Sequence, residues 1–245
     1  MAKPLTKDPA SARPRDHVTS TLAKQILSGT WSPGNRLPTE SELGETLGVS
    51  RTALRESIRN LAGKGLIESR TRSGTIVQPS AQWNHLDPDL LAWREELAPD
   101  LHFVRGLTEA RQAIEPVAAA FAADRATGQD LGRIEESYDA MCRASVRDIE
   151  ASVGADESFH LSVLAASHNP VFINFGAMIG SALRNAFRLT TSASDNYTAT
   201  LDMHGEVLEA IRMRRPDEAR KVMTQLLDIA SHDLARVIVR GTHTQ

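Results

Sequence analysis

SRTALRESIRNLAGKGLI, residues Ser50–Ile67, combines a row of arginines with a row of apolar residues. The arginines recur every fourth residue, at Arg51, Arg55 and Arg59. The apolar residues recur beside them, at Leu54, Ile58 and Leu61. This spacing puts the two sets on different faces of one helix. Because Ser50 is a favoured N-cap and Gly65 a favoured C-terminal stop, the sequence predicts a helix from Ser50 to about Lys64.

The segments on either side of this helix add further elements. Upstream, Val18–Leu27 has the apolar spacing of a helix, and a second helix is predicted between Thr39 and Gly48 because Thr39 and Glu42 form a capping box. Downstream, LIESRTRSGTIV, residues 66–77, predicts two short strands around a turn that contains glycine. Three helices followed by a β-hairpin form a winged helix-turn-helix.

The outer arc of the third helix has the chemistry of a DNA-reading surface. The backbone N–H groups at a helix N-terminus favour phosphate, arginine binds guanine with two donors, and arginines in the wing reach the neighbouring backbone. We therefore predict that double-stranded DNA is bound by Arg51, Thr52, Arg55, Arg59, Arg70 and Arg72. A solvated helix that happens to carry charges is the alternative, but it does not explain why a serine cap and a basic hairpin adjoin it.

Charge and composition agree with a two-domain chain. Residues 1–79 carry 12 Lys/Arg and 7 Asp/Glu, a net of +5, whereas the remaining residues carry 16 and 24, a net of -8. A basic front and an acidic back favour different partners, the front one a polyanion. No apolar run is long enough to span a membrane, and the single cysteine, Cys142, cannot form an internal disulfide. We therefore expect a cytoplasmic protein.

The domain organisation follows from these patterns. After Val77 no strand pattern appears, and the amphipathic segments predict only helices. The expected fold class is mostly α, with the winged helix-turn-helix first and an all-α helical domain second. We predict a flexible tail at 1–15, a DNA-binding domain at 16–79, a linker at 80–99, a helical effector-binding and dimerisation domain at 100–238, and a tail at 239–245.

Residues 17–78 closely resemble the DNA-binding domain of the GntR family of transcriptional regulators. The matching pieces are ILSG, PGNRLPTESELGETLGVSRTALRESIRNL, GLIE and GTIV. The resemblance implies that Arg51, Thr52, Arg55 and Gly74 occupy the family's DNA-contacting positions. One departure is Ser41, which stands where many members have an arginine, so one contact to DNA is expected to differ.

Residues 100–238 resemble the ligand domain of the FadR branch of this family, known as the FCD domain, which implies an antiparallel helical bundle. Asp156 and His160 are four residues apart, a spacing that suits two ligands of one metal ion and equally suits an ordinary side-chain contact. The resemblance implies that Asp156, His160 and His204 are metal ligands. It also implies a third histidine where this chain has Leu226, which cannot ligate. A divalent ion such as Zn, Ni or Mn is therefore expected to bind weakly or not at all.

An anionic effector is the second ligand that the resemblance implies. In the family the position of Arg111 faces the ligand pocket, and carboxylic or sugar acids are typical ligands. A guanidinium holds a carboxylate with two parallel hydrogen bonds, which lysine cannot do. We predict an effector site formed by Arg111, Glu115, Arg184 and Asn185. The alternatives are a salt bridge between Arg111 and Glu115 and a solvated helix face for the other two.

The predicted function is a homodimeric transcription regulator, a repressor of an operon for a sugar acid, such as an aldonate, or for another organic acid. Each winged helix would read one half of a pseudo-palindrome, and the acid would release the protein from its operator. The linker, with Trp83 and Trp93, resembles the sugar-acid branch, and both side chains are expected to pin it against the bundle. The alternatives are a metal-dependent enzyme acting on a small carboxylate and an effector-independent DNA-binding protein. We expect no enzyme activity and no membrane association.

Overall fold

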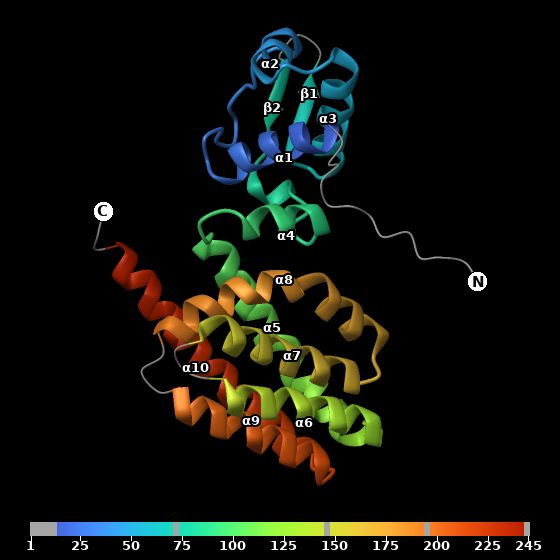
Figure 1. Cartoon of the computed structure of the whole chain (residues 1–245), viewed down its shortest axis with the longest axis vertical. Coiled ribbons are helices and arrows are strands. Elements are labelled where there is room, and N and C mark those ends of the chain that lie inside the picture. Colours follow the sequence, from blue (N-terminus) through green and yellow to red (C-terminus); the bar gives the residue numbers. More distant parts are fainter. Residues whose placement is uncertain (1–13, 71–73, 145–147, 194–196, 243–245) are drawn as a thin grey trace, which may run out of the picture. The chain divides into compact units, whose positions relative to one another are not determined.

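The computed structural model describes residues 14–70, 74–144, 148–193 and 197–242, without the side chains of 14–16, 181, 185–193, 197–199 and 240–242. The chain divides into two compact units, Met1–Ala98 and Pro99–Gln245, and each is described by itself (Figure 1). None of the helices within the described ranges has an apolar stretch of the length needed to span a lipid bilayer.

The first unit contains the predicted winged helix-turn-helix. Its helices and strands are α1 Pro14–Leu27, α2 Glu40–Leu47, α3 Arg51–Gly63, β1 Ile67–Arg70 and β2 Gly74–Val77. The two strands pair antiparallel, with Ile67 opposite Val77 and Arg70 opposite Gly74. Apolar side chains from all three helices and from the hairpin form one buried core. The mostly helical fold class, with a hairpin after the third helix, is therefore confirmed.

Two predicted helix starts carry the expected caps. The side chain of Thr39 accepts a hydrogen bond from Glu42 N, and Glu42 Oε2 accepts one from Thr39 N at 2.8 Å. At α3 the Ser50 hydroxyl accepts a hydrogen bond from Ala53 N at 3.3 Å. These bonds satisfy N–H groups that have no partner within the first turn of a helix. The local sequence therefore determines where α2 and α3 begin.

The end of α3 requires its glycine. Gly65 has φ +76°, a backbone conformation that other residues adopt only with strain. A Cβ atom at this position would lie 2.1 Å from the carbonyl oxygen of Gln82. Gly65 therefore stops α3 and also lets the chain segment around Gln82 pack directly against the end of the helix.

The segment that we expected to be a linker belongs to the first unit. It forms a short 3-10 helix, η1 Ser80–Gln82, and α4 Pro88–Glu95. Trp83 and Trp93 pack against the core of the first unit, whereas we expected them to pin the linker against the bundle. Leu90 is buried in the same core and turns one apolar face of α4 toward this unit. The start of α4, with Asp87 as the N-cap followed by Pro88, carries a helix signal in the sequence itself.

A buried lysine attaches α4 to the end of α3. Lys64 Nζ lies 2.7 Å from Asp87 Oδ1 and 2.7 Å from Asp89 Oδ2. The ammonium group also lies 5.6 Å from the centre of the Trp93 ring. Burial lowers the pKa of Lys64, but the hydrogen bonds with the two carboxylates outweigh it, so the pKa is raised from its ordinary value. Lys64 therefore stays charged and holds the recognition helix to α4.

The second unit is a helical bundle throughout its described residues. Its helices are α5 Leu101–Arg125, α6 Gly128–Arg143, α7 Ile149–Ala166, α8 Pro170–Ala193, α9 Tyr197–Arg212 and α10 Pro216–Thr242. Helix α8 continues through the polar residues to Ala193, and residues 194–196 lie outside the described ranges. A helix already formed extends at little cost, whereas starting one is unfavourable.

The core of this bundle contains small side chains from α5. Ala119, Ala122 and Ala123 are fully buried, and they pack in one cluster with side chains from the four helices α6, α7, α9 and α10. Small side chains let neighbouring helix backbones approach closely. The close packing brings polar groups on α5, α7 and α9 within reach of one another, and these groups form the site described next.

Candidate functional site

The recognition face of α3 is laid out as the sequence predicts. Leu54, Ile58 and Leu61 are buried in the core of the first unit. The residues of the outer arc are all exposed: Arg51, Thr52, Arg55 and Arg59. The arc starts at the N-terminus of α3, where backbone N–H groups and the helix dipole favour phosphate. The geometry is therefore suited to a helix that enters the major groove of DNA.

The wing is described only in part. Arg70 is exposed at the end of β1, and its Nε donates to Glu68 Oε2 at 2.9 Å. Hydrogen bonding to Arg70 outweighs partial desolvation and lowers the pKa of Glu68. Gly74, with φ +75°, opens β2 beside the side chain of Arg36. Arg72, which we predicted to contact DNA, lies outside the described residues.

Glu40 contacts the recognition face and was missed by our sequence analysis. Its Oε2 accepts a hydrogen bond of 2.8 Å from Arg55 Nε. The two residues are 15 positions apart, so no helical spacing rule connects them, and only the packing of α2 on α3 brings them together. The available signal was an acidic residue at the first position of the helix that precedes the recognition helix.

The second unit contains a row of buried polar and charged side chains that contact one another. Arg111 Nε donates to Glu115 Oε1 at 2.6 Å, and both side chains are almost fully buried, with 2% and 1% exposed. Glu115 Oε2 lies 2.6 Å from His160 Nδ1, on α7. The salt bridge that we considered as the alternative role of Arg111 is therefore present. A contact between Arg111 and an effector stays a prediction.

This row of contacts continues through the side chains of the three predicted metal ligands. Asp156 Oδ1 lies 3.3 Å from His160 Nε2 and 3.0 Å from His204 Nε2. The other ring nitrogen of His204 lies 2.6 Å from the carbonyl oxygen of Thr200. The three potential ligand atoms all lie within 4.8 Å of one another. The structure therefore contains a possible Asp/His metal site that joins α7 and α9.

The charges of this cluster stabilise one another. Burial raises the pKa of Glu115, but the charges of Arg111 and His160 lower it by a larger amount. The net pKa is about 2. Burial also raises the pKa of Asp156, but hydrogen bonds from His160 and His204 bring it well below its usual range. Burial lowers the pKa of His160, and the charge of Arg111 lowers it as well. Glu115 and Asp156 have the larger effect, so the pKa of His160 is raised from its ordinary value. Both carboxylates are therefore ionised at neutral pH.

The orientation of the histidines fits a metal ion. The Nδ1 atom of His204 faces the carbonyl oxygen of Thr200, that of His160 forms an ion-pair contact with Glu115, and each Nε2 atom faces Asp156. In metal sites a carboxylate or carbonyl acceptor of this kind orients the ring and leaves the other nitrogen for the ion. Leu226 is buried in the apolar core and offers no donor, so this set supplies three protein ligands. Imidazole and carboxylate donors suit Zn, Ni or Mn.

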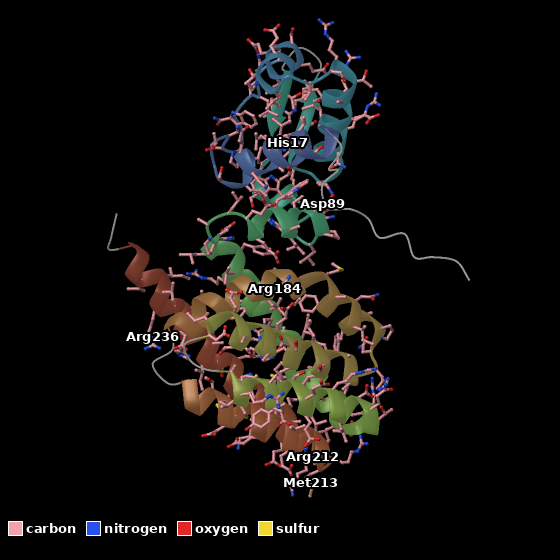
Figure 2. All side chains as sticks on the ribbon, viewed as in Figure 1. His17, Asp89, Arg184, Arg212, Met213 and Arg236 are labelled. Atoms are coloured by element: carbon pink, nitrogen blue, oxygen red, sulfur yellow. The ribbon has the colours of Figure 1, made fainter. Side chains whose placement is uncertain are left out.

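The other predicted effector residues lie on α8. Arg184, labelled in Figure 2, is exposed there. Its Nη1 lies 3.5 Å from Glu157 Oε2. The side chain of Asn185 lies outside the described residues. Because Glu157 follows Asp156 directly on α7, Arg184 lies beside the helix that carries two of the three possible metal ligands. Its role in effector binding stays a prediction.

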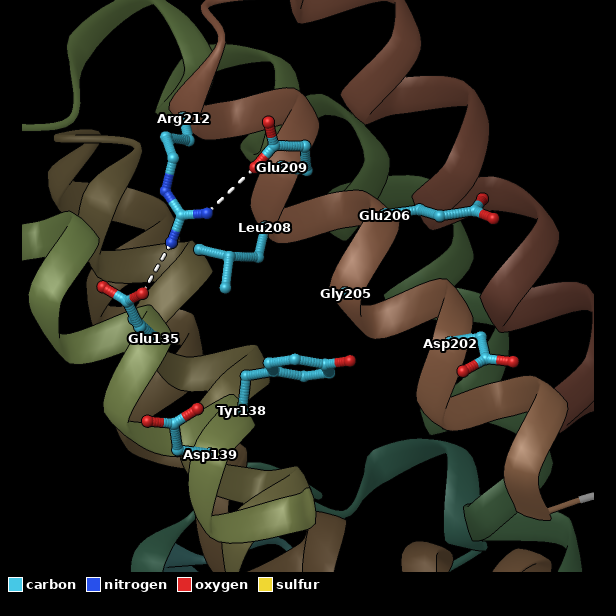
Figure 3. A pocket seen from close by; sticks show the side chains of 9 residues that line it. All are labelled: Glu135, Tyr138, Asp139, Asp202, Gly205, Glu206, Leu208, Glu209 and Arg212. Carbon is cyan, nitrogen blue, oxygen red and sulfur yellow. Dashed lines mark hydrogen bonds and ion pairs between the residues drawn. The ribbon is translucent and has the colours of Figure 1, made fainter.

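An open cleft between α6 and α9 is unsuited to an acid. Its volume is about 600 Å³, and Figure 3 shows the side chains around it. The residues that line it are Glu135, Tyr138, Asp139, Asp202, Gly205, Glu206, Leu208, Glu209 and Arg212. The one arginine of this lining is held between Glu135 and Glu209 at 2.7 and 2.9 Å. A carboxylate ligand would meet repulsion from the five acidic side chains of this lining, so the cleft does not suit an anion.

Comparison with known families matches both units. The model of the bacterial regulatory proteins of the gntR family matches residues 14–77. The model of the FCD domain matches residues 106–228. Both matches agree with the two resemblances that the sequence carries.

Individual relatives extend the match to nearly the whole chain. The galactonate operon transcriptional repressor of Escherichia coli (strain K12) is 36% identical over 223 residues, which cover 91% of this chain and 97% of that protein. The putative L-lactate dehydrogenase operon regulatory protein of the same organism is 29% identical over 234 residues, 90% of this chain and 86% of that protein. Among solved structures, that of Lar, which controls the agr system of Listeria monocytogenes, has a TM-score of 0.65 at 19% identity and covers 94% and 99% of the two chains. That structure shows the same fold.

Proposed function

We propose a function from the premise that this chain belongs to the GntR family of bacterial regulatory proteins and carries an FCD domain. The chain is a DNA-binding transcriptional regulator. We propose that it represses an operon for a sugar acid such as galactonate, or for another organic acid, and that this acid releases it from the operator. Similarity to the galactonate operon repressor supports the choice of acid.

The DNA-binding part of the proposal rests on the exposed arc of α3. Arg51, Thr52, Arg55 and Arg59 would contact the major groove, and Arg70, Arg72 and Gly74 of the wing would contact the backbone or minor groove. Two copies of the chain would form a homodimer, each reading one half of a pseudo-palindromic operator. An operator in bacterial DNA implies that the protein acts in the cytoplasm.

The effector part rests on one observation, the buried cluster that contains Arg111, Glu115 and His160. Burying charges is costly, and an apolar core would be at least as stable, so such a cluster favours a binding role. Arg111 would bind the carboxylate of the acid, near Glu115, with Arg184 and Asn185 from α8. Asp156, His160 and His204 would hold a divalent ion, which supplies positive charge to the acid, and occupancy would be weak because Leu226 replaces a ligand.

Release from DNA requires only modest coupling. An effector that binds the released form preferentially shifts the equilibrium by its difference in affinity, and about 1–3 kcal/mol is typical for coupled sites. A binding role needs no turnover of the acid, so we propose that the chain is not an enzyme.

The test is an operator-release titration with the full-length protein. A DNA fragment selected by the protein from a random duplex library serves as operator, and gel-shift assays follow release by galactonate, related aldonates and dicarboxylates, with and without EDTA. We expect release by one acid or a narrow group of acids.

Binding that no acid in the panel changes would favour an effector-independent DNA-binding protein. If chromatography shows that the protein consumes an acid when Zn, Ni or Mn is added, this would favour the metal-dependent enzyme. Either outcome contradicts the proposed function.

A further inference from the structure

An acidic side chain lies on the surface that is proposed to meet DNA. Glu40 is the first residue of α2, and its Oε2 is 2.8 Å from Arg55 Nε on α3. Both side chains are exposed, with 43% and 65% of their surfaces open to solvent. We propose that Glu40 is a positioning residue that orients Arg55 toward one base pair and thereby sets sequence preference. This inference rests on the proposed DNA-binding role of α3.

Stability alone does not account for this contact. Exposed ion pairs contribute little to folding, because water and salt screen them and both side chains lose freedom. A carboxylate close to DNA also repels the phosphates, which weakens binding to any sequence. A negative charge at this place therefore acts against general affinity for DNA, whereas an effect on Arg55 can favour selectivity.

The geometry explains how selectivity arises. Arginine reads guanine by donating two hydrogen bonds to O6 and N7. A free arginine side chain has many rotamers and can reach phosphates as well as bases, and ordering it on binding is costly. When Glu40 holds Nε, the terminal Nη1 and Nη2 groups remain as the pair of donors, and their direction is restricted.

The backbone of Glu40 is itself firmly held. Thr39, the N-cap of α2, and Glu42 form the reciprocal capping box, so the first turn of α2 is well defined. The positive end of the α2 dipole also favours a carboxylate at this position. Glu40 is therefore a fixed acceptor against which the flexible Arg55 is aligned.

The experiment compares base preferences of full-length variants. Wild type, Glu40→Gln, Arg55→Ala and the double variant each select from the same randomised duplex library, and sequencing gives the preference at every position. Glu40→Gln keeps the size of the side chain and removes its charge. Glu45→Gln is the matched control, because Glu45 is exposed on the same helix and, among the described residues, forms no ion pair with α3.

We expect Glu40→Gln to reduce the preference for the favoured base about tenfold, at the same operator position where Arg55→Ala reduces it. A tenfold change is within the range for one bidentate contact. The double variant should lose no more than Arg55→Ala alone, because Glu40 acts through Arg55. Both glutamine variants should bind random DNA a few times more tightly, since each removes one negative charge. Of these two glutamine variants, only Glu40→Gln should change the base preference.

Unchanged base preferences in Glu40→Gln, or an equal change in Glu45→Gln, would overturn the positioning role. Additive losses in the double variant would also overturn it, because Glu40 would then act independently of Arg55. A wild-type protein that selects no sequence at all would overturn the proposed DNA-reading role of α3, and with it this inference.

Discussion

At the scale of single residues, the ion pair of Arg111 and Glu115 is a buried interaction on which the stability of the second unit depends. Its side chains are only 2% and 1% exposed, within a bundle whose core consists mainly of apolar side chains. Each charge there depends on its partners, because water does not solvate it. The contrast is Arg212, whose pairs with Glu135 and Glu209 are exposed to solvent.

We therefore expect Arg111→Ala to destabilise the protein by about 3–5 kcal/mol, because it leaves Glu115 buried beside one partner fewer. Arg212→Ala is the matched control, and its loss should stay below about 1 kcal/mol, as for other exposed pairs. The measurement is denaturant unfolding of the full chain, followed by circular dichroism. Similar losses in the two variants would contradict the importance of burial.

The histidines give a second prediction at this scale. We expect the purified protein to contain Zn, Ni or Mn below one equivalent, and His160→Ala or His204→Ala to abolish that content, because each removes one of three ligands. At about a hundredfold excess of ion over its Kd, the ion should add about 3 kcal/mol of stability, and EDTA should remove it. Elemental analysis and thermal melting measure the two effects.

His232→Ala is the control for this experiment, since His232 is an exposed histidine of α10 outside the Asp156 cluster. It should keep the metal and the response to EDTA. Metal content that is equal in all three variants would rule out the site.

At the scale of elements, the end of α3 decides how the recognition helix joins the segment that follows. Gly65 adopts a positive φ and lies against Gln82, whereas Gly63, two residues earlier, is helical and has open space around its Cβ position. Two glycines in one short stretch thus have different roles. Lys64, between them, holds α4 through Asp87 and Asp89.

We predict that Gly65→Ala destabilises the protein by at least about 1–3 kcal/mol, the cost of backbone strain alone, because the new Cβ also forces the Gln82 carbonyl away. Gly63→Ala should be neutral or stabilising by up to about 1 kcal/mol, because alanine favours a helix. Thermal unfolding of the two variants checks the contrast. If both substitutions had the same effect, the close contact with Gln82 would not matter for stability.

At the scale of the whole molecule, the first unit extends further along the chain than the DNA-binding motif. Its core includes Leu90, and Trp83 and Trp93 pack against it. Lys64, a residue of the motif, finds its acidic partners only in the segment 87–89. The motif therefore depends on residues that follow it.

We expect a fragment of residues 1–98 to unfold cooperatively and a fragment of residues 1–79 to be less stable by several kcal/mol. Burying a single leucine contributes about 1.5–3 kcal/mol, and the shorter fragment loses Leu90, both tryptophans and the partners of Lys64. Thermal melts of the two fragments provide the measurement. Equal melting temperatures would show that α4 adds nothing to the first unit.

How much could be predicted varies with the scale. The winged helix-turn-helix, the helical second unit and the family were all predicted, because caps, glycines and apolar spacing act locally and leave signals in the sequence. Asp156, His160 and His204 were selected through the family resemblance, since a spacing of four residues alone fits many contacts. The pairing of Glu115 with His160 was not predicted, because the two residues lie on different helices.

The sequence by itself determined where α3 begins and ends, which of its faces is apolar and which carries arginines. These features depend on Ser50, Gly65 and a period of 3.6 residues, all within one short stretch. Only the tertiary structure decided that α4 joins the first unit, that Glu40 meets Arg55, and that Asp156 lies between two histidines. These contacts depend on how helices pack against one another, and residues distant in sequence meet there without any local pattern that records it.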